Sequence, residues 1–209
     1  MKPDIPDPKH KRKKEQKNEP KKNVNAKWIV TIFLLTVLIS AVFSMISNVL
    51  LMEASLFSAF IILLVIIFIG IIFDIIGVAV TAADPKPFHS MAAHKVPGGK
   101  EALKMLKNAE KVSSFCNDVV GDICGIISGT ASAAIVVLML TGLKSGGYVP
   151  TVLEIAMAAL VSGLTVGGKA VGKSLAMNQS TAIVHTAAKL VFYVKNGPKL
   201  IGKALRQKK

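Results

Sequence analysis

Five polar residues stand inside or beside long apolar segments, where ionisable groups are costly unless they are paired, hydrated or bound to an ion. They are three carboxylates, one amide and one ammonium: Asp74, Asn117, Asp118, Asp122 and Lys169. Carboxylate and amide oxygens are the ligands that hard cations such as Mg²⁺ prefer. The four oxygen-bearing residues are therefore candidate metal ligands, and Lys169 is a charge that could neutralise them.

Two interpretations of this set remain open. In the first, Asp74 and Lys169 form an internal salt bridge that holds the helices together, and Asp118 lies among headgroups as an acid at a helix start. In the second, the acids and Asn117 form a hard-cation site, and a helix break at the glycine pair 167–168 frees backbone carbonyls to join it. No nucleophile–base pattern occurs in the sequence, so we expect the protein not to be an enzyme.

The elements that must position these residues are four long apolar segments. They cover residues 28–52, 56–83, 118–143 and 149–172 of a chain that is 52% hydrophobic. A helix of about 20 apolar residues spans the hydrocarbon core, so we predict an all-α polytopic membrane protein with four transmembrane helices. Only 14 charge-free residues separate Glu154 from Lys169. We expect the fourth helix to extend past Lys169 or to break near the glycine pair.

The distribution of basic residues predicts the orientation in the membrane. Of the 26 Lys and Arg, 10 precede the first segment, 6 lie between the second and third, and 9 lie from Lys169 onward, which leaves only Lys144. Cytoplasmic segments retain Lys and Arg, whereas short translocated loops do not. We expect a multi-pass protein of the cell (inner) membrane with both termini in the cytoplasm.

The protein has a formal charge of +14, which could attract either nucleic acid or anionic lipid. No aromatic residues interleave with the basic clusters as a nucleic-acid stacking platform requires, so we expect no nucleic-acid binding. We attribute the charge to membrane sorting and to attraction between the protein and the anionic headgroups of the lipid bilayer.

Amphipathic stretches and basic tails make up the rest of the chain. Residues 88–115 and 178–195 combine apolar positions at helical spacing with lysines, which is typical of helices on a membrane surface. We predict that they form cytoplasmic belt helices. Residues 1–27 are rich in Lys and Pro and predict a disordered basic tail. Residues 196–209, after a break at 197–198, predict a second basic tail.

Glycines recur at close spacing in the third and fourth apolar segments. Small residues let helices approach closely in lipid, where van der Waals contact drives packing. We predict that these two helices form the packed centre, within one chain or between two chains. The residues of this predicted packing face are Gly121, Gly125, Gly129, Gly163, Gly167 and Gly168.

Three sequence elements carry a family resemblance. They are the run 73–83 followed by Asp-Pro-Lys-Pro-Phe, the Lys-rich stretch leading into Ser-Phe-Cys-Asn-Asp at 114–118, and Gly-Lys-Ala-Val-Gly-Lys-Ser-Leu-Ala at 168–176. Across them the chain resembles the transmembrane domain of the CorC/CNNM (cyclin-M-like, HlyC/CorC) magnesium transporters. The resemblance implies a three-helix domain with a helical belt over residues 56–195 and 28–52 as an additional N-terminal transmembrane helix. We expect the protein to be a homodimer. We expect the regulatory CBS domains of that family to be absent.

The resemblance also implies an ion site. The family uses a small polar residue in its first helix, an Asn at the start of its second, and a Glu in a Gly-Glu-x-x-Pro-Lys motif in its third. These positions correspond to the neighbourhood of Asp74, to Asn117 and to Lys169, with Gly172 replacing the Pro and Lys173 retained. An ammonium thus replaces the carboxylate of the motif. We expect a degenerate site, either in a protein related to divalent-cation (Mg²⁺) transport or in a non-transporting scaffold or regulatory subunit that Lys169 neutralises.

Overall fold

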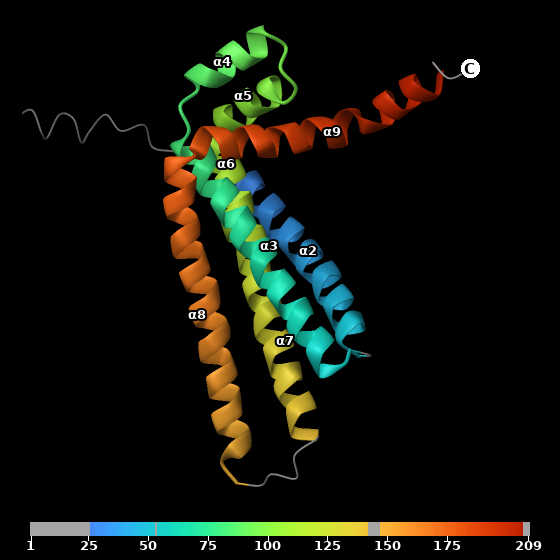
Figure 1. Ribbon diagram of the computed structural model, residues 1–209, viewed down its shortest axis with the longest axis vertical. Coiled ribbons are helices and arrows are strands. Elements are labelled where there is room, and N and C mark those ends of the chain that lie inside the picture. Colours follow the sequence, from blue (N-terminus) through green and yellow to red (C-terminus); the bar gives the residue numbers. More distant parts are fainter. Residues whose placement is uncertain (1–25, 53, 142–146, 207–209) are drawn as a thin grey trace, which may run out of the picture.

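The protein is an all-helical bundle with a layer of helices across one end (Figure 1). The computed structural model describes residues 26–52, 54–141 and 147–206, and all regular elements within them are helices. Four helices are long and apolar enough to cross a membrane: Ile29–Leu51, Leu56–Ala82, Ala109–Thr141 and Val149–Asn178. This confirms the predicted all-α, polytopic fold. The predicted disordered tail falls almost wholly on residues 1–25, which lie outside the described residues.

The second membrane helix, α3 (Leu56–Ala82), lies at the centre of the bundle. It packs against both α7 (Asp122–Thr141) and α8 (Val149–Asn178) (Figure 1). Buried side chains from all three helices form one core: Ala59, Leu63, Ile67, Ala131, Ile135, Val136, Met157 and Val161. The predicted packed centre of α7 and α8 alone is therefore incomplete, because α3 contacts both.

The first membrane helix, α2 (Ala26–Met52), is an outer member of the bundle. It runs antiparallel to α3 (Figure 1). Most of its contacts are with η1 and α7, and its Leu51 joins the core that contains Leu63 and Ile67 of α3. Ile32 and Ile39 pack against the buried cluster of Val119, Ile123 and Ile127.

The third membrane crossing is longer than the predicted range 118–143. A short α6 (Ala109–Ser114) continues into the π-helical segment η1 (Phe115–Gly121) and then into α7, so that one helical rod begins at Ala109. The predicted final residues 142–143 lie outside the described residues. A π-helical turn contains more residues than an α-helical turn, so η1 changes which side chains of the rod face α3.

The predicted belt helix over 88–115 is divided in the structure. α3 ends at Ala82 before the Asp84-Pro85 pair, and α4 (Lys86–Ala93) follows. Gly98 then turns the chain with a φ of 89°, and α5 (Gly99–Lys107) begins directly after it. An L side chain rarely adopts this φ, so the break needs the glycine.

The last helix, α9 (Ser180–Arg206), lies across the end of the bundle beneath α4 and α5 (Figure 1). It buries Val184 and Ala188 in a cluster with Phe88 and Ala102 of the belt. The predicted break at 197–198 is wrong, because α9 continues through it to Arg206. A proline inside a helix removes one hydrogen bond and bends the helix without having to end it.

The glycines of α7 and α8 do not all serve the predicted packing role. A Cβ added at Gly168 would contact Ile71, and one at Gly172 would lie 2.6 Å from Cγ1 of Ile75, so these two glycines let α8 approach α3 closely. Four others have no heavy atom within 4 Å of an added Cβ: Gly125, Gly129, Gly163 and Gly167. Within a single chain, the predicted packing face is therefore largely open.

Two glycines on the same helix provide a matched test of this division. We expect Gly172→Ala to lower the free energy of unfolding by about 1–3 kcal/mol, because the new methyl group overpacks the contact with Ile75. Gly163→Ala meets open space and gains up to about 1 kcal/mol of helix propensity. Denaturant unfolding in detergent micelles measures both values. A loss at Gly163 equal to that at Gly172 would show that a second molecule covers Gly163, because no group among the described residues of the same chain does.

Candidate ion site between α3, η1 and α8

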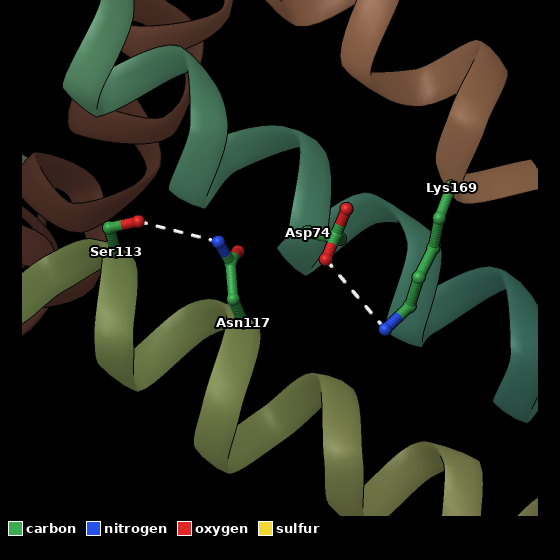
Figure 2. A network of polar contacts seen from close by, with 4 residues as sticks. All are labelled: Asp74, Ser113, Asn117 and Lys169. Atoms are coloured by element: carbon green, nitrogen blue, oxygen red, sulfur yellow. Dashed lines mark hydrogen bonds and ion pairs between the residues drawn. The ribbon is translucent and has the colours of Figure 1, made fainter. Parts of the chain in front are cut away.

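Three of the five polar residues meet between three helices. Asp74 comes from α3, Asn117 from η1 and Lys169 from α8, and Figure 2 shows their side chains directed into the space between these helices. Asp74 lies eight residues before the end of α3 and Lys169 nine before the end of α8. At 1.5 Å per residue both lie about 12–14 Å from the same end of the bundle.

An ion pair joins α3 to α8. The Lys169 Nζ lies 3.7 Å from the Asp74 Oδ1, with 7% of the Asp74 side chain and 25% of the Lys169 side chain exposed (Figure 2). The salt bridge of the first interpretation is therefore present. A carboxylate this deeply buried needs an opposite charge nearby, and the ammonium of Lys169 provides it.

Asn117 reaches the same space because α3 has no side chain opposite it. The Asn117 Oδ1 lies against Gly77, one turn after Asp74, where an added Cβ would collide with it. The Asn117 Nδ2 donates to the Ser113 Oγ at 3.3 Å (Figure 2). Gly77 and Ser113 were not predicted as parts of the site. The sequence could have indicated both residues. Gly77 lies three residues from Asp74 and Ser113 four from Asn117, so each shares a helix face with a predicted site residue.

Gly121 has a different role from the predicted one. A Cβ added at Gly121 would lie 3.4 Å from the Lys169 Nζ. The missing side chain thus leaves room for the ammonium beside the rod that carries Asn117. Gly121 supports the polar site more than it supports packing between helix backbones.

Asp118 and Asp122 lie on the other face of the rod. Both are exposed, and the Asp118 Oδ2 accepts a hydrogen bond from the Ser114 Oγ at 2.7 Å. Residues four apart share a helix face, so Asn117 and Gly121 face α3 together while Asp118 and Asp122 face away. The structure therefore does not bring the four candidate metal ligands together. Among the described residues, no group of three His, Cys, Asp or Glu side chains could hold a metal ion.

The glycine pair of α8 adds no backbone ligands. α8 is one continuous helix from Val149 to Asn178, so it extends past Lys169 and does not break at Gly167-Gly168. Its carbonyls at this depth remain in intrahelical hydrogen bonds. The expectation that this pair frees backbone oxygens for a cation is wrong.

The residues present do not fit Mg²⁺ while Lys169 occupies this position. Two oxygens, the Asp74 Oδ2 and the Asn117 Oδ1, are buried without a hydrogen-bond partner among the described residues. Mg²⁺ requires near-octahedral oxygen coordination, and two protein oxygens supply a minority of it. The ammonium beside Asp74 also places a like charge next to any bound cation. The arrangement is suited to the ammonium of Lys169, a positive charge that is covalently attached to α8.

Comparison with known proteins does not assign the chain to a family. No family model, no curated protein and no solved structure matches it. The site is therefore interpreted from its own geometry.

The strength of the Asp74–Lys169 pair is measurable. We expect Lys169→Met to lower the free energy of unfolding by about 3 kcal/mol, near the lower end for a broken buried pair, because Lys169 is partly exposed. Combining it with Asp74→Asn is expected to cost less than the sum of the two single changes. Lys173→Met, at an exposed position on the same helix, is the control and should leave stability unchanged. Additive single effects would show that the two charges do not interact.

Proposed function

We propose that this chain is a polytopic membrane protein with a degenerate ion site of the CorC/CNNM type, and that it acts as a non-transporting scaffold or regulatory subunit. The observation that supports this proposal is the distance of 3.7 Å between the Lys169 Nζ and the Asp74 Oδ1. The ammonium supplies the charge that a cation would otherwise bring. Because Lys169 is tethered, its effective concentration beside Asp74 is high at any cation concentration.

The membrane placement and the assembly of this subunit form part of the same proposal. We propose that the end of the bundle that carries α4, α5 and α9 faces the cytoplasm, because the loop between α3 and α6 and the segment after Lys169 hold most of the basic residues outside the N-terminal tail. We also propose a homodimer that uses the open face of Gly125 and Gly129. Small residues at this spacing allow close helix contact in lipid.

Restoring a carboxylate at position 169 tests the proposed neutralisation. We expect Lys169→Glu to become thermally more stable in millimolar Mg²⁺, while the native protein does not. At ten times the dissociation constant the gain is about 1.4 kcal/mol. Lys173→Glu introduces the same charge change at an exposed position one turn away and is expected to show no Mg²⁺ response. Stabilisation of the native protein by millimolar Mg²⁺ would refute the neutralised site.

A second candidate function is a role related to divalent-cation (Mg²⁺) transport. Two observations favour it. The ion-pair distance exceeds the roughly 2.7–2.9 Å of a charge-assisted hydrogen bond, so Lys169 is loosely held. The buried Asp74 Oδ2 and Asn117 Oδ1 also have no partner among the described residues. In this alternative the ammonium moves toward solvent and exposes both oxygens.

Measuring Mg²⁺ flux in proteoliposomes separates the two functions. If the protein transports Mg²⁺, Asp74→Ala and Asn117→Ala should each abolish the flux, because each removes one of the two inward-facing oxygens. Asp118→Ala removes an exposed carboxylate and is the matched control that should retain flux. No flux from the native protein, or a flux that neither site variant changes, would exclude transport through this site.

A further inference from the structure

A groove with no function in the ion site lies where α9 crosses α3. Its volume is about 640 Å³. Ile72, Ile75 and Ile76 of α3 form one wall. The other wall comes from the first half of α9, with Ile183 and Leu190 as its largest apolar members.

The groove face of α9 is a helical stripe that the chain leaves uncovered. Ile183, Thr186, Leu190 and Tyr193 follow one another at spacings of three and four residues and all line the groove. The neighbouring face buries Val184 and Ala188 against the belt, and the His185 Nε2 lies 3.3 Å from the Pro97 carbonyl oxygen. α4, α5 and the ends of α3 and α8 therefore hold α9 in place while its apolar stripe faces the groove.

In the membrane placement proposed above, with the end of α3 at the cytoplasmic surface, the groove lies near the depth where acyl chains meet headgroups. Ile72 to Ile76 stand six to ten residues before the end of α3 at Ala82, which is about 9–15 Å along the helix. Amphipathic helices bury their apolar face about 5–10 Å into the same boundary. An apolar groove at this level is surrounded by lipid.

The polar groups at the groove are those that bind a phosphate ester. Lys189 and Tyr193 line the groove on α9, and both are exposed. An ammonium pairs with a phosphate as a point charge, and a tyrosine places its ring in the apolar layer and its hydroxyl among headgroups. Gln179, between α8 and α9, adds amide donors to the groove lining.

We propose that this groove binds one anionic phospholipid, with an acyl chain against Ile72 and Ile76 and its phosphate at Lys189 and Tyr193. Charge favours a lipid over a second copy of the chain. α9 carries Lys189, Lys195, Lys199, Lys203 and Arg206 and no acidic residue, so a second α9 would be repelled and an anionic headgroup attracted. The proposal is independent of the ion site, because no residue of the Asp74–Lys169 pair lines the groove.

Two lysines on α9 allow a matched experiment with the full chain in detergent micelles. The probes are dioleoyl phosphatidylglycerol and dioleoyl phosphatidylcholine, and bound lipid is counted by native mass spectrometry across a titration. We expect phosphatidylglycerol to be retained with one lipid per chain and phosphatidylcholine to bind more weakly. Lys189→Gln should weaken phosphatidylglycerol binding about fivefold, as expected for one lysine beside an anionic headgroup. Lys195→Gln removes the same charge outside the groove and should leave binding unchanged.

The outcomes that overturn the proposal are distinct. Equal weakening by Lys189→Gln and Lys195→Gln would show general charge attraction and no groove site. Equal retention of the two lipids would exclude headgroup recognition. Ile76→Trp should fill the groove and reduce retention of phosphatidylglycerol. If it instead abolishes dimer formation and leaves lipid retention unchanged, the groove holds a second copy. The two lysines are exposed, so the decisive comparison does not depend on a variant that disturbs folding.

Discussion

The buried carboxylate of Asp74 is the constraint on which the arrangement of the membrane helices depends. Within an apolar core, a single charge is tolerated only if an opposite charge reaches it. Lys169 does so from α8, and Gly168 and Gly172 on either side of it let α8 lie against Ile71 and Ile75 of α3. The ion pair and the close contact therefore set the same register between α3 and α8. Gly121 leaves space for the ammonium, which adds η1 to the same junction.

The rod formed by α6, η1 and α7 sorts its polar groups onto two faces. Asn117 turns toward Gly77 on α3, while Asp118 turns outward to Ser114. A backbone that continued as an ordinary α-helix would distribute these residues differently, since the π-helical segment shifts the register of the turns after it. The result is a site with one acid, one amide and one ammonium. In this set the ammonium of Lys169 already provides the positive charge beside Asp74 that a bound cation would bring. This is the physical basis of the proposed non-transporting role.

α3 connects the two features that we interpret functionally. It carries Asp74 toward η1 and α8, and it presents Ile72 and Ile76 to the groove beneath α9. The buried face of α9 packs against α4, α5 and the ends of α3 and α8, which leaves the apolar stripe of α9 facing the groove. In the proposed placement, a basic helix fixed in this way lies along the membrane surface and offers its apolar stripe to lipid.

The sequence alone determined the four membrane crossings, the end of α3 before Asp84-Pro85, and the pairing of Asp74 with Lys169 as one of two alternatives. These follow from local properties: apolar length, proline chemistry and the cost of an unpaired charge. The tertiary structure decided which faces meet. It placed Asp118 and Asp122 outward, left Gly125 and Gly129 open, kept α8 unbroken at Gly167-Gly168 and continued α9 through Pro198. Neighbouring residues on a helix point about 100° apart. One π-helical turn or one close contact between distant segments therefore reassigns a side chain from the interior to the surface, and spacing along the chain does not encode that choice.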